Sequence, residues 1–396
     1  MDTLYPFRLE LQSIMYSRLY LHIPFCMRKC PYCAFASWQG AENDADTYAE
    51  LLLKEMLLAR QRSVPLQPLD SVYFGGGTPS LLSPRKVARV LERVAELFGL
   101  NERAEITLEA NPGTVDCRKL DGFRSAGINR ISFGVQSFDD RMLAALGRIH
   151  TAHQAREAFG EARKTGFSNI SIDLINTLPG QTPELWRADL EQAMALAPEH
   201  LSVYGLTLEE GTPFADRYSH NSPLLPDEDL SADMFEMADK LLTEGGYEHY
   251  EIANYARPDC RSRHNSGYWR RDGYLGLGVG AHSFMLEGKF GTRFCNTPDL
   301  GEYSSSVAKG ELPRRDITPL VREDALAEFM FLGLRMADGV TFSAFREIFG
   351  IGIDQIFGKE LEELLAQNLL QADSNGLALT RRGMLLSNRV FSRFLL

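Results

Sequence analysis

Short apolar segments alternate with longer amphipathic segments through the first half of the chain. Six of the short segments are rich in β-branched residues and end at Gly, Pro, Asn or Thr, as buried strands do. They are Leu19–Ile23, Ser71–Phe74, Glu105–Leu108, Arg130–Phe133, Asn169–Leu174 and Leu201–Leu206. Helical periodicity follows at Asp46–Arg62, Pro84–Phe98, Asp139–Leu146, Thr151–Lys164 and Thr182–Leu196, and more weakly at Asp116–Ser125. This alternation predicts parallel βαβ units and, with six of them, an α/β fold built on a partial (β/α)6 barrel.

The second half of the chain is less regular. An acidic helix is predicted at Asp227–Glu244, and an aromatic, glycine-rich run follows at Arg263–Phe284. Three helical segments and a hairpin-like segment then predict a small winged-helix-like domain; they are Arg322–Met336, Phe342–Phe349, Ile356–Gln367 and Leu370–Thr380. We therefore expect an N-terminal extension (1–17), a barrel core (18–222), a barrel-associated α+β region (223–317) and a C-terminal α+β winged-helix-like domain (318–396).

Composition and charge narrow the class of protein. The 396 residues are 44% hydrophobic and 24% charged, which is ordinary for a globular protein. A net charge of -11 argues against a nucleic-acid partner, because phosphate binding requires a basic surface. No apolar run approaches the roughly 18 residues of a membrane span, and the first residues lack the order of a signal peptide. With six cysteines, a normal intracellular count, these features predict a cytoplasmic protein. Met15 is an alternative start to Met1.

Three of the six cysteines lie within eight residues, directly after the first predicted strand. Cys26, Cys30 and Cys33 have C-x3-C-x2-C spacing. Thiolates suit zinc or iron–sulfur sites, and a structural zinc site takes four ligands. Three cysteines without a fourth leave one iron of a [4Fe–4S] cluster open, and the amino and carboxylate groups of a methionine moiety can chelate that iron. Two alternatives stay open: a zinc loop completed by a distant His or Cys, and three thiols in a tight turn.

Glycine or polar residues follow the other predicted strands. In parallel sheets, catalytic and ligand-binding residues lie at these carboxyl ends of the strands. The run Gly75–Pro79 (GGGTP) follows the second strand, and glycines allow the backbone to approach a ligand. Glu109 offers a carboxylate to an ammonium group, and Gln136 and Asp173 offer polar groups at strand ends. Arg148 has the planar fork that binds a carboxylate. Each alone has an ordinary alternative: a glycine turn, a solvated Glu, a structural hydrogen-bond network or a surface Arg.

Together these motifs resemble the radical-SAM family that contains the oxygen-independent coproporphyrinogen III oxidases and the HemW-type heme chaperones. The resemblance runs through nearly the whole chain. It implies a [4Fe–4S] cluster on the three cysteines, S-adenosylmethionine (SAM) at the open iron, and a capacity to cleave SAM reductively. The positions where the oxidases contact SAM are Tyr20, Tyr32, Gly76, Gly77, Thr78, Glu109, Gln136, Arg148, Asp173 and Thr207. The sequence around Thr207 departs from the oxidase pattern.

Three features favour the HemW-type branch over the oxidases. The oxidases have a fourth cysteine two positions beyond the third, where this chain has Phe35, and they have a longer N-terminal segment than the 25 residues that precede Cys26. The run from His264 to Trp269 resembles the H-N-x-x-Y-W motif of that branch, which is implicated in heme binding. The resemblance therefore implies a heme site that includes His264, Asn265, Tyr268 and Trp269. The alternative is a core histidine packed in the seam between domains.

The predicted function is heme binding and delivery to heme-requiring respiratory proteins. Decarboxylation of coproporphyrinogen propionates is the alternative, and a zinc-binding interaction module is the third hypothesis. The resemblance also implies an electron donor to the cluster and membrane-associated heme-requiring enzymes as partners, and it allows a homodimer. The basic and apolar run from Arg381 to Phe394 fits an amphipathic helix packed on its own domain better than a membrane contact. Cys117, Cys260 and Cys295 read as lone thiols.

Overall fold

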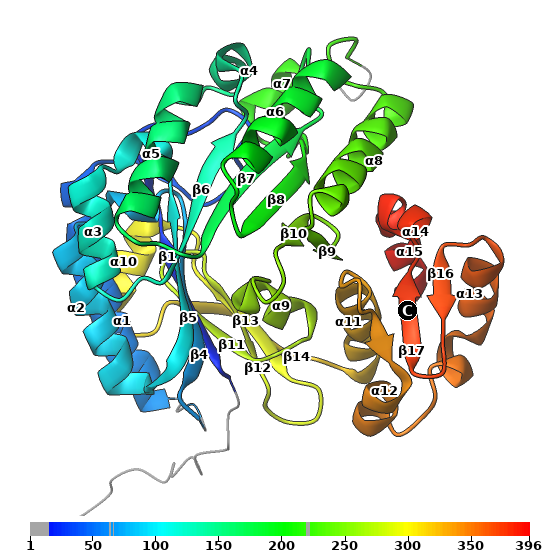
Figure 1. Ribbon diagram of the computed structural model, residues 1–396. Coiled ribbons are helices and arrows are strands. Elements are labelled where there is room, and N and C mark those ends of the chain that lie inside the picture. The colour runs from blue at the N-terminus through cyan, green and yellow to red at the C-terminus, as the bar shows by residue number, and fades with distance from the viewer. Residues whose placement is uncertain (1–15, 63–64, 66, 219–221) are drawn as a thin grey trace, which may run out of the picture.

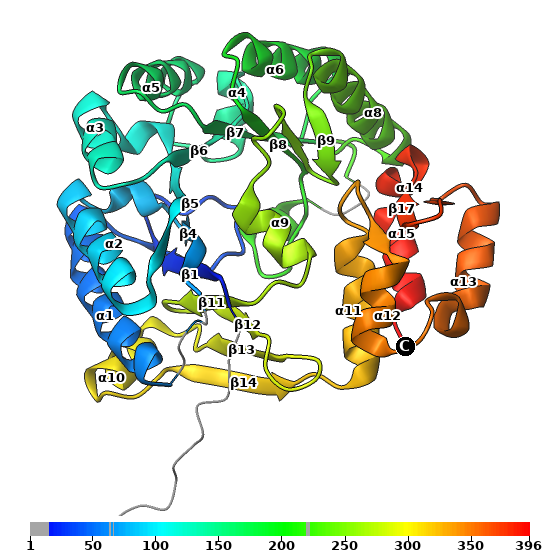
Figure 2. The same cartoon turned by 60° about the horizontal axis from the view of Figure 1, so that its bottom comes forward.

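One large curved sheet organises the molecule. The computed structural model describes residues 16–62, 65, 67–218 and 222–396. The predicted extension (1–17) lies almost wholly outside these residues. Within the described residues the large sheet has twelve strands, in the order β14-β13-β12-β11-β1-β4-β5-β6-β7-β8-β10-β9. Helices cover its convex face, and the strands curve around an interior space (Figures 1 and 2).

The six predicted strands form the centre of this sheet, and they pair in parallel in chain order. They are β1 (Arg18–Ile23), β4 (Leu69–Gly76), β5 (Leu100–Ala110), β6 (Arg130–Gln136), β7 (Ile170–Asn176) and β8 (His200–Gly205). The crossover helices are α1 (Glu42–Arg62), α2 (Pro84–Phe98), α3 (Cys117–Ser125), α4 (Asp140–Ala145), α5 (Ala152–Lys164) and α6 (Pro183–Ala195). The partial barrel is confirmed.

Helix α2 shows how the sequence sets these elements. Ser83 accepts a hydrogen bond from the backbone N–H of Lys86, and Pro84 occupies the first turn, where its missing N–H removes no helical bond. Gly99 ends the helix with a φ of 72°. The apolar residues recur on one face and are buried against the sheet, so capping and periodicity specify the same helix.

Six strands that the sequence did not reveal extend both edges of the barrel. On one side β11 (Tyr274–Leu277) pairs in parallel with β1, and three antiparallel strands continue from it: β12 (His282–Met285), β13 (Thr292–Asn296) and β14 (Arg314–Pro319). On the other side β10 (Asn254–Ala256) and β9 (Glu248–Glu251) pair antiparallel beyond β8. The less regular region 223–317 therefore builds largely on the barrel sheet itself.

The connecting helices of this region are α7 (Pro213–Arg217), α8 (Glu228–Glu244), α9 (Arg263–Trp269) and α10 (Leu300–Ala308). Three of them lie outside the curve of the sheet or at its rim. Helix α9, which carries the H-N-x-x-Y-W run, lies inside the curve (Figure 2). Its first turn contacts Ser71 near the start of β4 and Glu105 in the middle of β5, so this turn lies away from the carboxyl ends of the parallel strands.

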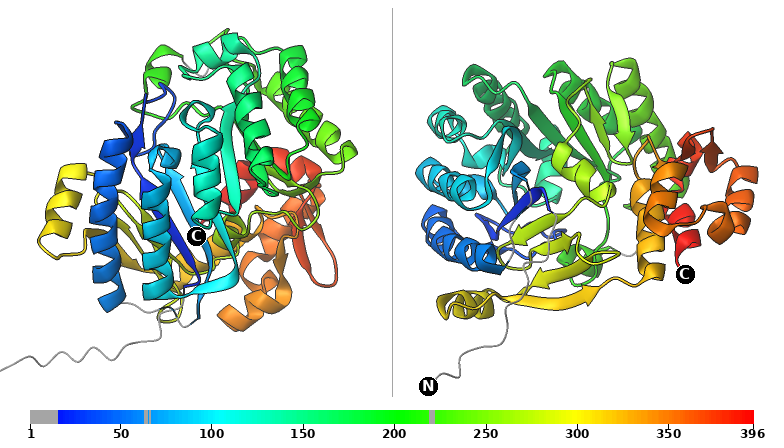
Figure 3. Two further views of the ribbon diagram at one scale, coloured as in Figure 1. Left: turned by 60° about the vertical axis from the view of Figure 1, so that its left-hand side comes forward. Right: turned by 90° about the horizontal axis from the view of Figure 1, so that it is seen from below.

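The C-terminal part has its own core and lies to one side of the barrel (Figure 3). It contains α11 (Arg322–Gly333), β15 (Val340–Thr341), α12 (Phe342–Phe349), α13 (Asp354–Ala366), β16 (Leu370–Ala372), β17 (Gly376–Leu379), α14 (Arg381–Leu385) and α15 (Ser387–Phe391). Its three strands pair in the order β15-β17-β16. Val390 and Phe394 are buried in this core, so the basic and apolar final run packs on its own domain. Within the described residues no helix is long and apolar enough to span a bilayer.

Candidate functional site

The three-cysteine loop begins where β1 ends. Short strands β2 (Phe25–Cys26) and β3 (Trp38–Gln39) pair in parallel at its base. His22 holds the far side of the loop, because its Nε2 donates to the carbonyl of Ala36 at 2.8 Å. Its Nδ1 then accepts from the Tyr20 hydroxyl at 3.0 Å, which fixes one neutral tautomer. Burial lowers the pKa of His22, so the imidazole stays neutral and keeps both of these hydrogen bonds.

The three cysteines line one cavity of about 500 Å³ at the carboxyl ends of the parallel strands. All three are free thiols. The Thr78 hydroxyl donates to Cys26 Sγ at 3.4 Å, and the Arg148 guanidinium donates to Cys30 Sγ at 3.6 Å. Burial raises the pKa of the Cys26 and Cys33 thiols. These donors would stabilise thiolates once a metal replaced the protons.

The arrangement of the three thiols fits an iron–sulfur cluster. Across residues 16–62, 65, 67–218 and 222–396, no group of three or more His, Cys, Asp or Glu side chains converges on one ion position. The cysteines of a [4Fe–4S] cluster bind different irons, so they need to border a cluster-sized space rather than a point. The thiols meet that requirement because all three border the same cavity, and soft sulfur donors suit iron–sulfur clusters.

Glycines at the end of β4 and directly after it allow the backbone to pass against the cysteine loop. A Cβ on Gly77 would lie 2.8 Å from the Phe25 carbonyl oxygen and 3.0 Å from Cys26 Sγ. Gly76 has a φ of +114°, and a Cβ there would lie 2.7 Å from the His22 ring. A side chain at either position would push the loop away, so the glycine run is required by close approach.

Glu109 lies in the cavity wall near the end of β5. Its Oε1 accepts from the Tyr73 hydroxyl at 2.8 Å, and its Oε2 accepts from the backbone N–H of Gly76 at 3.2 Å. Burial raises the pKa of this carboxyl to about 7, and the negative charge of Asp173 adds to the effect. A cationic or hydrogen-bond-donating ligand in the cavity would therefore find a fixed, partly desolvated acceptor.

The adjacent part of the wall is formed by the end of β6, which pairs with β5. Gln136 has a φ of 73°, an uncommon conformation that costs about 1–3 kcal/mol in a non-glycine residue and is often found at binding sites. Gly134 leaves room there, because a Cβ would lie 3.0 Å from Gln136 Nε2 and 3.3 Å from an Arg148 nitrogen. The Arg148 guanidinium donates to the Gly134 carbonyl at 2.5 Å. Strain at Gln136 is thus concentrated at the cavity.

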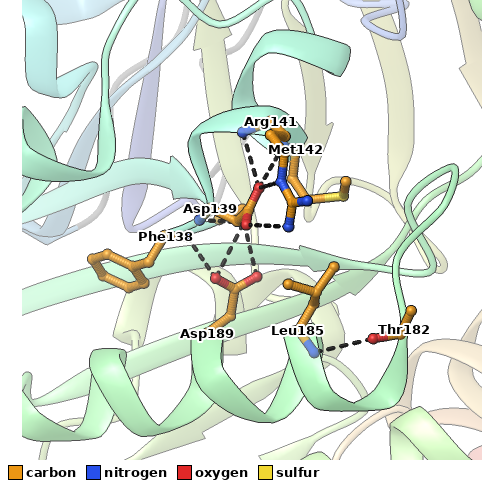
Figure 4. Close-up of polar contacts among 8 residues, drawn as sticks. Phe138, Asp139, Arg141, Met142, Thr182, Leu185 and Asp189 are labelled. Carbon is orange, nitrogen blue, oxygen red and sulfur yellow. Dashed lines mark hydrogen bonds and ion pairs between the residues drawn. The ribbon is translucent and has the colours of Figure 1, made fainter.

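A buried carboxylate supports the turn that follows Gln136. Asp189 of α6 accepts from the Ser137 hydroxyl at 2.8 Å and from the Phe138 backbone N–H at 2.6 Å. Figure 4 shows this carboxylate pointing at the turn, beside the Asp139 cap of α4. Burial raises the pKa of Asp189 to about 6. The turn is therefore tied to the helix behind it, which explains how a strained residue can be held in place.

Comparisons with known proteins agree with this geometry. The radical SAM superfamily model matches residues 20–193, and the HemN C-terminal domain model matches residues 320–386. Heme chaperone HemW of Lactococcus lactis is 36% identical to this chain over 95% of its length and 97% of the relative. A relative from Danio rerio, radical S-adenosyl methionine domain-containing protein 1, mitochondrial, is 36% identical over 96% of this chain and 86% of its own. The chain belongs to the HemW family of radical-SAM proteins.

A solved structure shows the same fold. Coproporphyrinogen III oxidase (HemN) from Escherichia coli superimposes with a TM-score of 0.82, at 26% identity, over 99% of this chain and 96% of the oxidase. The radical-SAM fold of this HemW-family chain, with its C-terminal domain, is therefore confirmed. Membership of the superfamily implies a [4Fe–4S] cluster and SAM, and the thiols and polar walls of the cavity fit both.

Most residues that the resemblance assigned to SAM border the cavity of this HemW-family protein. Those that do are Tyr32, Gly76, Gly77, Thr78, Glu109, Gln136, Arg148, Asp173 and Thr207. Tyr20 is not among the lining residues. Its ring packs on Tyr73, and its hydroxyl is bound to His22. Asp173 also has a partner within the protein, because the Ser132 hydroxyl lies 3.2 Å from both of its oxygens.

Only one of the four predicted heme residues borders the cavity. Asn265 borders the cavity, but His264, Tyr268 and Trp269 do not. His264 is 0% exposed, its Nδ1 lies 2.8 Å from Ser71 Oγ, and its Nε2 lies 2.7 Å from the Tyr268 hydroxyl. Neither ring nitrogen is open to a heme iron in this conformation. The geometry corresponds to the alternative of a core histidine.

Sequence reasoning missed several residues on the cavity wall. Arg130 and Ser132 lie on β6, and Ser202 and Tyr204 lie on β8. A signal was present, because residues 130, 132, 134 and 136 alternate with apolar residues along β6. That alternation is typical of a strand with one polar and one apolar face, and it points the polar face inward.

Proposed function

We propose that this protein holds a [4Fe–4S] cluster on Cys26, Cys30 and Cys33, binds SAM in the adjoining cavity, and binds heme for delivery to heme-requiring proteins. The observation that carries the proposal is that all three loop cysteines line one cavity together with charged and polar side chains, in a chain of the HemW family. The cluster supplies, when bound and reduced, the electron for reductive cleavage of SAM.

The residues of the cavity have separate tasks. Glu109 accepts hydrogen bonds from the SAM amino group, and the backbone after β4 approaches the methionine moiety because Gly76 and Gly77 lack side chains. Arg148 lies beside Cys30, where a guanidinium attracts a carboxylate. Asp173 and Gln136 face the cavity from neighbouring strands and suit ribose hydroxyls and the adenine edge.

Heme binding is supported by the family and by the environment of the loop. The related proteins from Lactococcus lactis, Bacillus subtilis and Escherichia coli are heme chaperones. Phe35 occupies the position of the fourth cysteine of the oxidases, and its ring is 66% exposed beside the cavity mouth. Met27 on the same loop is also exposed. Exposed apolar side chains of this kind suit contact with a macrocycle.

The oxidase alternative has its own support in the superposition on the Escherichia coli enzyme. The two functions are separated by anaerobic reconstitution followed by paired assays. We expect the reconstituted protein to retain heme through gel filtration and to leave coproporphyrinogen III unchanged in the presence of SAM and dithionite. Conversion of coproporphyrinogen to protoporphyrinogen would contradict the proposal, and so would failure to retain heme. The oxidase itself serves as the positive control for turnover.

The partners are part of the same proposal. A one-electron donor must reach the cluster, and the exposed loop with Arg28 and Lys29 is the accessible approach to it. Heme recipients would be respiratory, membrane-associated proteins met from the cytoplasm, and the protein itself would assemble as a homodimer. Heme transfer from the loaded protein to a purified apo-cytochrome, followed by absorbance, tests the delivery step.

A further inference from the structure

His264 lies beneath the cavity, in contact with the side chain that holds Glu109. Its ring stacks on the ring of Tyr73, with centroids 5.0 Å apart and planes inclined by 29°. The Tyr73 hydroxyl donates to Glu109 Oε1. Tyr20 also stacks on Tyr73, with centroids 6.1 Å apart and planes inclined by 22°. Tyr73 therefore contacts two rings, one of them belonging to the H-N-x-x-Y-W run.

The hydrogen bonds of His264 fix its ring in that stack. Ser71 on β4 and Tyr268 on α9 occupy the two ring nitrogens. The backbone N–H groups of Arg263 and His264 donate to the Glu105 carboxylate at 3.0 and 2.9 Å. Glu105 lies four residues before Glu109 on β5, on the same face of the strand. Helix α9 and the Glu109 carboxylate are thus anchored to one strand.

Two other residues of the run make packing contacts of their own. Gly267 lies against Arg18, since a Cβ there would fall 1.9 Å from Arg18 Nε. Arg18 in turn pairs with Asp272 at 2.9 Å. Trp269 lies under the Arg335 guanidinium of the C-terminal part, 4.2 Å from carbon to ring centroid. These contacts fix the position of α9 inside the barrel.

We propose that His264 is a positioning residue for Glu109, and that through Tyr73 it holds the carboxylate that receives the SAM amino group. The inference rests on the proposed SAM site. Because both ring nitrogens are occupied in a buried setting, ligation of a heme iron by His264 would leave Ser71 or Tyr268 without its partner. The run is therefore a support of the SAM cavity, and Asn265 is its contribution to the cavity wall.

The test compares two buried histidines, each hydrogen-bonded to one serine and one tyrosine hydroxyl. His200 lies between Ser171 and Tyr250, at 2.8 Å from each hydroxyl, but it does not contact Tyr73. In the reconstituted holoprotein we expect His264→Ala to raise the SAM dissociation constant about tenfold, the effect of losing one well-placed hydrogen bond to a charged group. We expect His200→Ala to lower the melting temperature comparably and to leave SAM affinity within twofold. His264→Phe keeps the ring if the alanine variant fails to fold.

A second readout separates positioning from general destabilisation. The Tyr73 hydrogen bond favours ionised Glu109, so its loss in Tyr73→Phe should move the pH midpoint of SAM affinity upward. The other charged or titratable groups that interact with Glu109 are Tyr20, Arg130, Asp173, Tyr204 and Tyr268, and these variants leave all five in place. His264→Ala should move the midpoint in the same direction, and the double variant should move it no further than Tyr73→Phe.

The outcomes are distinct. Heme affinity unchanged in His264→Ala, with weakened SAM binding and a raised midpoint, is the expected result. Unchanged SAM affinity in His264→Ala, or loss of heme binding without any effect on SAM, would overturn the inference and leave the proposed function standing. A wild-type holoprotein that binds no SAM at all would refute the proposed function and the inference together.

Discussion

Replacing Glu109 with Gln removes a carboxyl group whose ionisation the fold disfavours. Burial raises its pKa to about 7 from an ordinary 4.5, although Tyr73, Gly76 and Arg130 favour the charged form. One pKa unit corresponds to about 1.4 kcal/mol, so ionised Glu109 lowers the free energy of unfolding by up to roughly 3 kcal/mol. Because Glu109 borders the cavity, solvent there reduces this figure, and about 2 kcal/mol is a reasonable expectation.

The direction of this pH dependence follows from the number of protons that the folded and unfolded states bind. Between pH 4.5 and about 7 the folded protein holds a proton on Glu109 that the unfolded chain has lost, so this group makes stability fall as the pH rises through that window. The neutral Gln variant lacks this slope. Urea unfolding of the SAM-free protein should therefore show little difference between Glu109→Gln and wild type near pH 4.5, and a more stable variant at pH 8. The same pH dependence in both proteins would refute the reasoning.

SAM binding should respond in the opposite direction. An ionised carboxylate accepts hydrogen bonds from the amino group, and a hydrogen bond to a charged group contributes about 1.5–3 kcal/mol. We expect Glu109→Gln to weaken SAM binding at pH 8 by roughly tenfold or more, and to weaken it much less at pH 6. Calorimetry of the anaerobic holoprotein measures both, and the variant corrects for titration of the ligand itself. A variant that binds SAM equally well at pH 8 would contradict the role of Glu109.

Three further predictions follow from the contacts of the site. Cys26→Ser, Cys30→Ser and Cys33→Ser should each abolish the visible absorbance and bound iron of the reconstituted protein, whereas Cys117→Ser, at an exposed helix start, should not. Gly77→Ala should lower the free energy of unfolding by about 1–3 kcal/mol and reduce the iron content, because its Cβ would meet Phe25 and Cys26. The control is Gly160→Ala in α5, where a Cβ has nothing within 4 Å, and thermal unfolding should show it to be neutral or stabilising. Asp189→Ala should cost about 2–3 kcal/mol, since it leaves Ser137 and the Phe138 N–H unpaired; a change below 0.5 kcal/mol in urea unfolding would contradict that role.

The parallel core was predictable because strand and helix patterns agreed with their caps. Each of the six central strands carries a buried apolar run, and the loop cysteines and Glu109 follow the ends of such runs. The inward residues of β6 were equally accessible to a period-two reading, since Arg130 and Ser132 alternate with Ile131 and Phe133. Local patterns decided these elements, so the sequence was sufficient.

The flanking strands were not predictable for a tertiary reason. Strand β11 is four residues long and contains Gly276, and it forms because β1 presents an open edge that takes it in parallel register. Gly276 is required there, since a Cβ would lie 2.0 Å from the His282 carbonyl oxygen. Such a strand is specified by its neighbour rather than by its own propensity.

The role of the H-N-x-x-Y-W run likewise depends on residues that are distant in the sequence. A histidine beside aromatic residues has the composition of a heme pocket, and only the fold reveals that Ser71, nearly two hundred residues earlier, occupies its Nδ1. Glu105 likewise binds the first turn of α9 across a long separation in sequence. Residue types indicated a special site, but its partners came from distant strands.

The central claim is that three cysteines hold an iron–sulfur cluster whose remaining iron is open to SAM. Electron paramagnetic resonance of the reduced, anaerobically reconstituted protein, recorded with and without SAM, tests this most directly. We expect about four irons per chain in a parallel iron analysis, and a cluster signal that changes when SAM is added. A protein that binds no cluster, or a cluster signal that SAM leaves unchanged, would contradict it.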